Sequence, residues 1–234
     1  MVFDTYYVPG PGFINLLKNS RSHAIEYKIC GMPEIRNILK SNINLYKDLY
    51  EKKKSKKIIL AVGLFVIKEE KLEMDGDDGI SLKSVLNFYY ALLKLAKNNP
   101  EYYVVYKPKL MQEQDEVLEN MKPEYRTLVD SLDNFKILTD PKYNSYVLVE
   151  LADLVVGKVS ALMEEAFAFG KKIIYYDTEY VINSFNYFMN ELDILVYNAK
   201  ELDMKTKELF GRPFTELELN FRKLYFNDNY GVQG

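Results

Sequence analysis

Short apolar runs rich in β-branched residues alternate with stretches of helical periodicity from residue 58 to residue 198, and this alternation most constrains the fold. The runs lack polar alternation, which is typical of parallel strands covered on both faces. We expect strands at 58–67, 102–107, 135–139, 153–157, 172–177 and 193–198. We expect helices at 81–99, 114–121, 123–132, 145–152, 160–170 and 180–192. This order forms right-handed crossovers, so the sequence predicts an α/β fold with a Rossmann-like parallel sheet flanked by helices over 58–200.

The chain outside 58–200 divides into a partial N-terminal segment over 1–52 and a C-terminal helical tail over 201–234. Strands are expected at 4–9 and 26–31, and helices at 12–20, 33–52 and 199–226. Fifty residues supply little core alone, so the N-terminal segment is expected to dock on the main domain or to be the remnant of a larger one. The basic cluster KKKSKK (52–57) marks the boundary between the two parts.

The composition excludes several kinds of site. One cysteine, Cys30, excludes a disulfide framework and a multi-cysteine zinc site, and one histidine, His23, argues against His-pair metal motifs and a histidine triad. We therefore expect no metal and no cofactor, and Cys30, in an apolar strand, is expected to be buried. The net charge of −3 argues against nucleic acid as a partner. The sequence has no secretory signal and no apolar run near the ~20 residues of a membrane span, which predicts a cytoplasmic setting.

The segment ADLVVGKVSALMEEAFAFGKKIIYYDTEY (152–180) carries the clearest chemical pattern. A buried strand ends at Gly157, and after a short loop with Lys158 a helix opens at Ser160. The first N–H groups of a helix have no internal partners and lie at the positive end of its dipole, so they form a site for phosphate. The Ser160 hydroxyl and the Lys158 charge add to that site, and the small residues Gly157, Ser160 and Ala161 permit close approach of a ligand. A carboxylate one turn further in accepts the hydroxyls of a ribose.

A purely structural interpretation of the same segment stays open. Ser160 is then only an N-cap, the acidic residues of the first turn only complement the helix dipole, and Gly170 only ends the helix.

The segment resembles the C-terminal domain of GT-B glycosyltransferases and their relatives. SALMEEA (160–166) is similar to the helix of UDP-N-acetylglucosamine 2-epimerases that continues Gln-Glu-Glu-Ala. The order of strand, helix and Tyr-Asp-x-Glu-x-Tyr-like stretch, with YDTEY at 176–180, resembles the CDP-glycerol glycerophosphotransferases and the capsule-polysaccharide group. YYVPGPGFINLL and YKICGMPEI, within the first 35 residues, resemble the end of the first domain of these enzymes.

The resemblance implies a role for individual residues. Ser160 and the Ala161 backbone meet the donor diphosphate, and Glu165 binds the ribose hydroxyls. Lys107 matches the lysine of a Lys-x-His-Pro motif. The sequence departs from the families in YKPKL (106–110), where the motif histidine is replaced and Lys109 follows Pro108. The epimerase helix begins with a serine-glycine-glycine turn whose serine and first glycine align with Val159 and Ser160, so the glycine pair is lost here.

A GT-B enzyme has two domains, and most of the first is absent from this chain. The resemblance therefore implies the donor-nucleotide-binding part of a GT-B-type glycosyltransferase or glycerophosphotransferase in surface polysaccharide synthesis, with a nucleotide-activated sugar or polyol as its ligand. The ending DNYGVQG is expected to mark a truncation. The alternatives are a non-catalytic nucleotide-binding or interaction module and a UDP-sugar 2-epimerase relative. KKKSKK also leaves open a peripheral contact with anionic lipid at the inner face of the membrane.

Overall fold

The computed structural model describes eight stretches of the chain: 2–8, 10–19, 23–30, 43–63, 81–109, 111–158, 160–178 and 191–226. Several expectations lie outside them. These are the strand residues 64–67, the first part of the helix at 33–52, most of the helix at 180–192, Glu179, Tyr180 and the C-terminal DNYGVQG.

The described strands of the main domain form one parallel sheet in the order β5-β4-β3-β6-β7-β8. The strands are β3 (Lys57–Val62), β4 (Tyr102–Lys107), β5 (Phe135–Ile137), β6 (Leu154–Gly157), β7 (Lys172–Tyr176) and β8 (Leu195–Val196). Every adjacent pair runs parallel. The α/β class and the Rossmann-like parallel sheet are therefore confirmed.

Helices cover both faces of this sheet, which explains why its strands carry unbroken apolar runs. One face packs on α3 (Leu82–Asn98), α4 (Met111–Asn120), α5 (Pro123–Ser131) and α9 (Ala199–Gly211). The other face packs on α2 (Lys47–Lys53), α6 (Ser145–Leu151), α7 (Ala161–Ala168) and α10 (Glu216–Phe226). In β3, Ile59 and Ala61 point to the first face and Ile58 and Leu60 to the second, and all four are buried.

Local signals set the helix ends where the sequence indicates them. Ser81 caps α3, because its side chain accepts a hydrogen bond from the Ser84 amide at 3.2 Å. Gly170 follows α7 with φ of 77°, the left-handed conformation that glycine adopts at low cost. The expected helix over 33–52 differs in its described part, where a 3-10 turn, η2 (Ile43–Tyr46), precedes α2.

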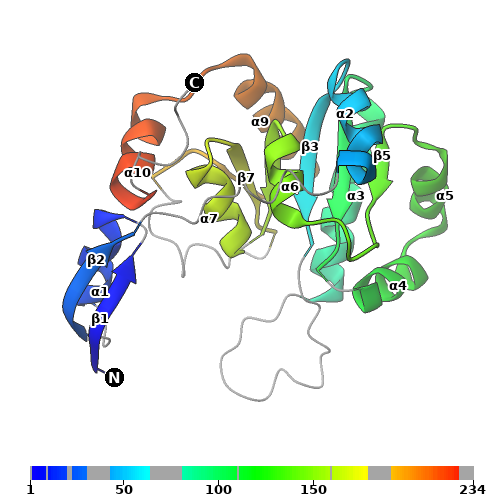
Figure 1. Cartoon of the computed structure of the whole chain (residues 1–234). Coiled ribbons are helices and arrows are strands. Elements are labelled where there is room, and N and C mark those ends of the chain that lie inside the picture. The colour runs from blue at the N-terminus through cyan, green and yellow to red at the C-terminus, as the bar shows by residue number, and fades with distance from the viewer. Residues whose placement is uncertain are drawn as a thin grey trace.

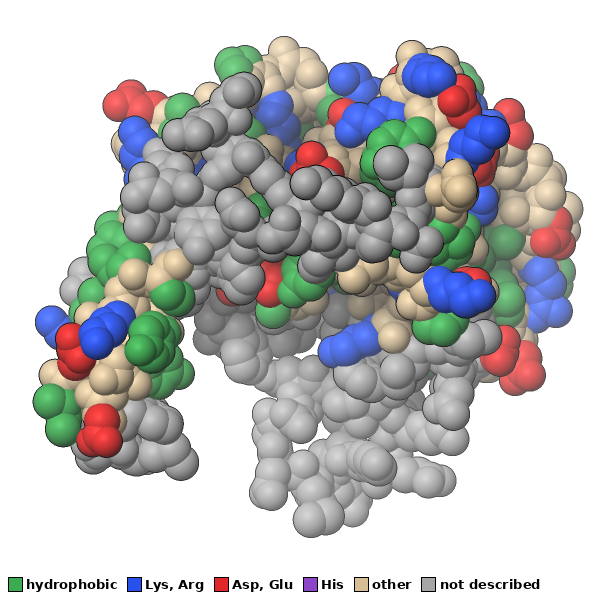
Figure 2. All heavy atoms as spheres, in the orientation of Figure 1, with side chains coloured by type: hydrophobic (Ala, Val, Ile, Leu, Met, Phe, Trp, Pro, Cys, Tyr) green, Lys and Arg blue, Asp and Glu red, His purple; other side chains and the backbone are tan. Residues whose placement is uncertain are grey.

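The N-terminal segment is a βαβ unit of β1 (Val2–Val8), α1 (Pro11–Asn19) and β2 (His23–Ile29), with β1 and β2 parallel. In Figure 1 it lies beneath α10, at the opposite end of the molecule from α4 and α5, and α1 packs on α10. The prediction that Cys30 is buried is wrong. Glu26 and Lys28, which alternate in step with Cys30, are exposed, and so are Ile25 and Ile29 on the other face of β2. Figure 2 shows hydrophobic side chains exposed among charged ones on this unit.

The lysine cluster at 52–57 contacts the fold more than a solvated linker does. Lys53 Nζ donates to the Leu151 carbonyl at 2.6 Å, and Lys52 lies 5.3 Å from the centre of the Tyr103 ring. Lys54 pairs with Glu51 on the surface at 2.8 Å. The cluster therefore ends α2 and begins β3. The division of the chain at 52, 58 and 200 stays a prediction.

Candidate functional site

The strand order places a topological switch between β3 and β6. The chain runs from β3 outward to β4 and β5, then returns to add β6, β7 and β8 on the other side. The helices that follow the two central strands lie on opposite faces, α3 on one and α7 on the other. In open α/β sheets this arrangement opens a crevice at the carboxyl ends of the strands, where ligands bind. We call the region between the starts of α3 and α7, where this rule predicts a ligand site, the switch crevice.

Strand register brings predicted site residues from distant parts of the sequence to the switch crevice. Val62 pairs with Lys107, and Gly157 pairs with Tyr175, at the carboxyl ends of their strands. Because Ala61 pairs with Val156, these four residues form one row across the sheet. Lys107 and Gly157 therefore lie two strands apart, about 10 Å along the row.

Ser160 caps the start of α7. Its Oγ accepts a hydrogen bond from the Leu162 amide at 3.4 Å, and its carbonyl accepts one from the Met163 amide at 2.9 Å. The N-cap interpretation is thus confirmed. The hydroxyl proton of a cap that accepts stays available to donate to a ligand, and the Ala161 amide, at the first helical position, has no acceptor within the helix. The phosphate site at Ser160 and Ala161 stays a prediction compatible with this cap.

Packing explains why a glycine stands at position 157. A Cβ on Gly157 would lie 2.8 Å from Met163 Sδ and 3.4 Å from Val62 Cβ. Its missing side chain therefore lets α7 pack closely on the end of β6. The further prediction that Gly157 gives room to a ligand is not needed to explain the glycine.

Lys158 lies inside the protein and links the two walls of the switch crevice. Its residue is 4% exposed, and its Nζ donates to the Ser84 hydroxyl in the first turn of α3. Ser84 Oγ lies 3.3 Å from Thr178 Oγ1, just after β7. A buried ammonium needs polar partners, and the Ser84 hydroxyl supplies one. The structure thus places the Lys158 charge in this buried cluster, between the ends of β6 and β7 and the start of α3.

The carboxylates of α7 lie in a partly buried tyrosine environment. Glu165 accepts a hydrogen bond from the Tyr146 hydroxyl of α6 at 3.3 Å. Burial raises the pKa of Glu165, although this hydrogen bond opposes the shift. Burial, followed by the charge of Glu165, also raises the pKa of Glu164. Both side chains therefore accept protons more readily than exposed glutamates do.

Tyr175 supplies a polar group that the sequence reasoning missed. Its residue is fully buried, and its hydroxyl has no hydrogen-bond partner among the described residues. Burial, with a smaller contribution from Glu164, raises the pKa of Tyr175 well above its ordinary value. The hydroxyl therefore stays protonated at neutral pH, close to the first turns of α7.

Lys107 ends β4 at the other side of the switch crevice. Its side chain is half-buried, and its carbonyl accepts a hydrogen bond from the Gly63 amide at 2.8 Å as the chain leaves β3. Burial lowers the pKa of Lys107, and the nearby charge of Asp140 opposes this. Lys107 thus brings a cation to the row that Gly157 shares, and its contact with a donor stays a prediction.

The described residues contain no cluster of three or more His, Cys, Asp or Glu side chains arranged to hold a metal ion. Within the same part of the chain, no helix combines the length and the apolar character that crossing a membrane requires.

Comparison with solved structures identifies the architecture. UDP-GlcNAc 2-epimerase from Neisseria meningitidis, bound to UDP-GlcNAc, superposes with a TM-score of 0.54 at 13% identity, over 97% of this chain and 58% of that one. A variant of the wall teichoic acid polymerase TagF, soaked with CDPG, superposes with a TM-score of 0.55 at 13% identity, over 96% of this chain and 52% of that one. The S. aureus MnaA–UDP co-structure gives 0.50 at 14% identity, over 96% and 56%. No protein-family model and no curated protein matches the sequence.

The main domain has the Rossmann-like fold of a GT-B domain. The superposition confirms the fold that the resemblance implied. Identities of 13–14% carry information on fold alone. The chain spans between 52% and 58% of the length of these neighbours.

Proposed function

We propose that the switch crevice binds the diphosphate of a nucleotide-activated sugar or polyol donor. The observation that carries the proposal is the start of α7, which lies at the topological switch with Ser160 as its cap. A helix N-terminus stabilises phosphate through its free amides and its dipole. Lys107, on the same row of the sheet as Gly157, adds a positive charge. Neighbours of the same fold carry UDP-GlcNAc or UDP in their structures, which supports this class of ligand.

The residues of the crevice divide the work by their chemistry. The Ala161 amide and the Ser160 hydroxyl donate to the diphosphate, and Glu165, held by Tyr146, accepts the ribose hydroxyls. These donors are fixed before the ligand arrives, so they stabilise the charge of a departing nucleotide diphosphate without a metal. Lys158 has a structural role in this proposal. Its buried contact with Ser84 holds the start of α3 against the loop between β6 and α7.

On this basis the chain is the donor-binding part of a GT-B-type glycosyltransferase or glycerophosphotransferase of surface polysaccharide synthesis. The binding site for the acceptor, and the general base that deprotonates its hydroxyl, then come from the first domain of such an enzyme. A non-catalytic nucleotide-binding module is the second candidate, and the sequence YKPKL (106–110), which lacks the motif histidine, favours it. Turnover of a labelled donor distinguishes the enzyme from the module. A relative of the UDP-sugar 2-epimerases is the third candidate function, and a UDP-GlcNAc 2-epimerase among the solved structures of the same fold supports it.

A thermal-shift screen with UDP, CDP, GDP and CMP tests the proposal. A nucleotide at 100 times its Kd stabilises the native state by about 2.7 kcal/mol, which raises the Tm by roughly 5–10 °C for a chain of this size. Ser160→Ala and Glu165→Ala are expected to remove most of that shift. The loss of a cap alone lowers the Tm of the free protein, so Asn198→Ala, which uncaps α9, is the matched control that keeps the full nucleotide shift. Midpoints that none of the four nucleotides changes contradict the proposal.

A further inference from the structure

A second concave site lies on the other side of α3 from the α7 helix. It has a volume of about 450 Å³, within the range of small-molecule sites. Four tyrosines and two lysines give it its character: Tyr90, Tyr125, Tyr176, Tyr197, Lys94 and Lys200. These residues come from α3, α5, the end of β7, and the segment where β8 leads into α9. We call this site the tyrosine pocket.

The tyrosine pocket is distinct from the phosphate end of the switch crevice. Its helices, α3, α5 and α9, cover one face of the sheet, whereas α7 covers the opposite face. The two sites approach each other at Thr178, which lines the pocket and lies 3.3 Å from the Ser84 hydroxyl. A ligand in the pocket therefore meets a set of side chains that includes neither Ser160 nor Glu165.

Part of the pocket wall is a preformed aromatic stack. The rings of Tyr90 and Tyr125 lie with centroids 4.0 Å apart and an interplanar angle of 23°. The Tyr90 hydroxyl accepts a hydrogen bond from the Lys122 amide at 3.1 Å, and Lys94 Nζ lies 5.9 Å from the centre of the Tyr125 ring. Side chains that are fixed before binding lose little entropy when a ligand arrives. The stack is thus a rigid surface for the apolar face of a carbohydrate ligand.

The floor and rim of the pocket offer uncharged hydrogen-bonding groups. Burial, followed by the charge of Glu201, raises the pKa of Tyr176 to about 12, so its hydroxyl stays protonated at neutral pH. Asn87 and Asn198 also line the pocket, and the Asn198 amide, which caps α9, keeps one N–H for a ligand. Hydroxyls and amides both donate and accept, which suits a ligand that carries several hydroxyl groups.

The charges at the pocket favour an anion. Lys94 and Lys200 are exposed, and no acidic side chain is among the described residues that line the pocket. Glu201 is not among the residues that line the pocket; its carboxylate is held beside the start of α9, where it accepts from the Tyr197 amide at 2.8 Å and from Asn198 Nδ2 at 2.6 Å. Its charge reaches Tyr176, but the two lysines outnumber this one carboxylate. The pocket also includes the first residues of α9, where the positive end of the helix dipole lies.

We propose that the tyrosine pocket binds a phosphorylated carbohydrate, either a sugar phosphate or a polyol phosphate. The phosphate lies between Lys94 and Lys200, the hydroxyls meet the Tyr176 hydroxyl and the two asparagine amides, and the carbon skeleton lies against the Tyr90–Tyr125 stack. The proposal does not rest on nucleotide binding in the switch crevice, and each stands if the other fails.

Calorimetric titration of the full chain with N-acetylglucosamine 1-phosphate and with glycerol 3-phosphate tests it. At least one ester is expected to bind saturably, and both N-acetylglucosamine without phosphate and inorganic phosphate are expected to bind at least tenfold more weakly. The double variant Lys94→Gln with Lys200→Gln is expected to raise the Kd at least tenfold, about 1.4 kcal/mol. The matched control is Lys97→Gln with Lys207→Gln. It also removes one positive charge from α3 and one from α9, but both lie outside the pocket, so the Kd is expected to stay unchanged.

Four results would overturn the proposal. They are no saturable binding of either ester up to about 10 mM, an affinity for inorganic phosphate equal to that for the esters, an unchanged Kd in the Lys94/Lys200 variant, or loss of ester binding in Ser160→Ala. The last result would assign the ester to the switch crevice. The Lys94/Lys200 variant is expected to keep the full thermal shift with UDP, because UDP binds in the switch crevice and not in the tyrosine pocket.

Discussion

The variant Gly63→Ala is expected to lose about 3 kcal/mol of unfolding free energy. A Cβ at this position would lie 2.7 Å from Pro108 Cα, 2.8 Å from Tyr106 Oη and 2.9 Å from the Lys107 carbonyl oxygen. Two of these atoms belong to the backbone of the segment beside β3, so relief requires the end of β4 to move. Overpacking usually costs 1–3 kcal/mol, and contact with fixed backbone places this site at the upper end.

Urea unfolding at pH 7 measures this loss, with Gly211→Ala as the matched control. Nothing lies within 4 Å of a Cβ at Gly211, which ends α9, so alanine there is expected to be neutral or to stabilise by up to about 1 kcal/mol. Equal stabilities of the two alanine variants would mean that β3 and the 106–108 segment do not approach as described.

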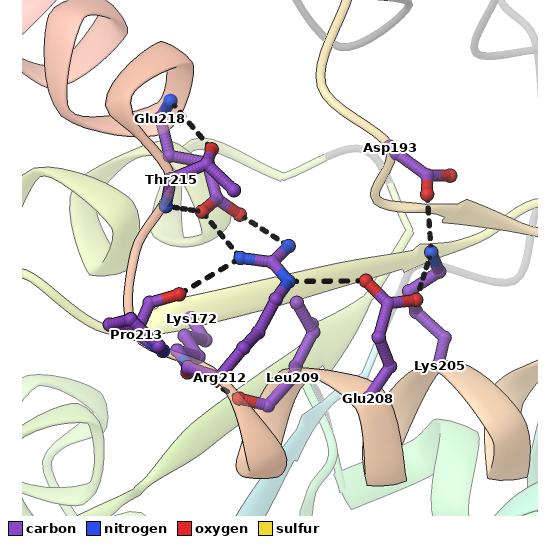
Figure 3. A network of polar contacts seen from close by, with 9 residues as sticks. All are labelled: Lys172, Asp193, Lys205, Glu208, Leu209, Arg212, Pro213, Thr215 and Glu218. Carbon is purple, nitrogen blue, oxygen red and sulfur yellow. Dashed lines mark hydrogen bonds and ion pairs between the residues drawn. The ribbon is translucent and has the colours of Figure 1, made fainter.

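The variant Arg212→Met is also expected to cost about 3 kcal/mol. Figure 3 shows Arg212 between α9 and α10, where its guanidinium donates to both oxygens of Glu218, at 2.7 and 3.0 Å, and to Glu208 at 3.1 Å. The Glu218 side chain is 6% exposed. Removal of one partner of a buried pair leaves a charge without compensation, which typically costs 3–5 kcal/mol. Glu218 keeps its bond from the Thr215 amide at 2.6 Å, which places the loss at the lower end.

Two further variants separate the charge from the packing in the same urea experiment. Arg212→Met combined with Glu218→Gln is expected to recover part of the loss, because glutamine is neutral and its oxygen still accepts from Thr215. Lys54→Gln, which breaks the exposed pair with Glu51, is expected to change stability by less than about 0.5 kcal/mol. A loss below about 1 kcal/mol for Arg212→Met would contradict the role of this contact in holding α10 against α9.

The same contact gives the protein a defined acid sensitivity. Burial alone would raise the pKa of Glu218, but the hydrogen bonds from Arg212 and Thr215 outweigh it and lower the pKa. A carboxyl whose folded-state pKa is depressed stabilises the fold above its unfolded pKa, about 4.3 for glutamate, and this contribution disappears as the pH falls through the folded value. The advantage of the natural sequence over Arg212→Met is therefore expected to shrink below about pH 4.3.

Local periodicity was sufficient to predict most of the main domain. The strand at 102–107 matches β4 residue for residue, and the helix expected after Ser81 is α3 with that serine as its cap. These elements are buried on both faces, so their sequence pattern and their final environment agree. Cys30 shows the limit, because an apolar strand pattern does not reveal that the strand belongs to a two-stranded sheet with exposed residues on both faces.

The sequence predicted only those features of the candidate site that lie within one strand–loop–helix segment. Ser160 was recognised as a helix start from its neighbours in sequence, and its cap is in place. The partners of Lys158 and Glu165 were not predictable in this way. Ser84 meets Lys158, and Tyr146 meets Glu165, through the order of the strands and the packing of α6 beside α7. Strand order is a long-range property that periodicity does not encode.

The amide NMR spectrum of the full chain during titration with UDP tests the central claim most directly. Binding at the start of α7 is expected to shift the Ala161 and Leu162 amide resonances in proportion to occupancy. The Ala199 and Lys200 amides, at the start of α9, serve as an internal control and are expected to stay in place. Saturable shifts centred on α9, or no saturable shift at the start of α7, would contradict donor binding in the switch crevice.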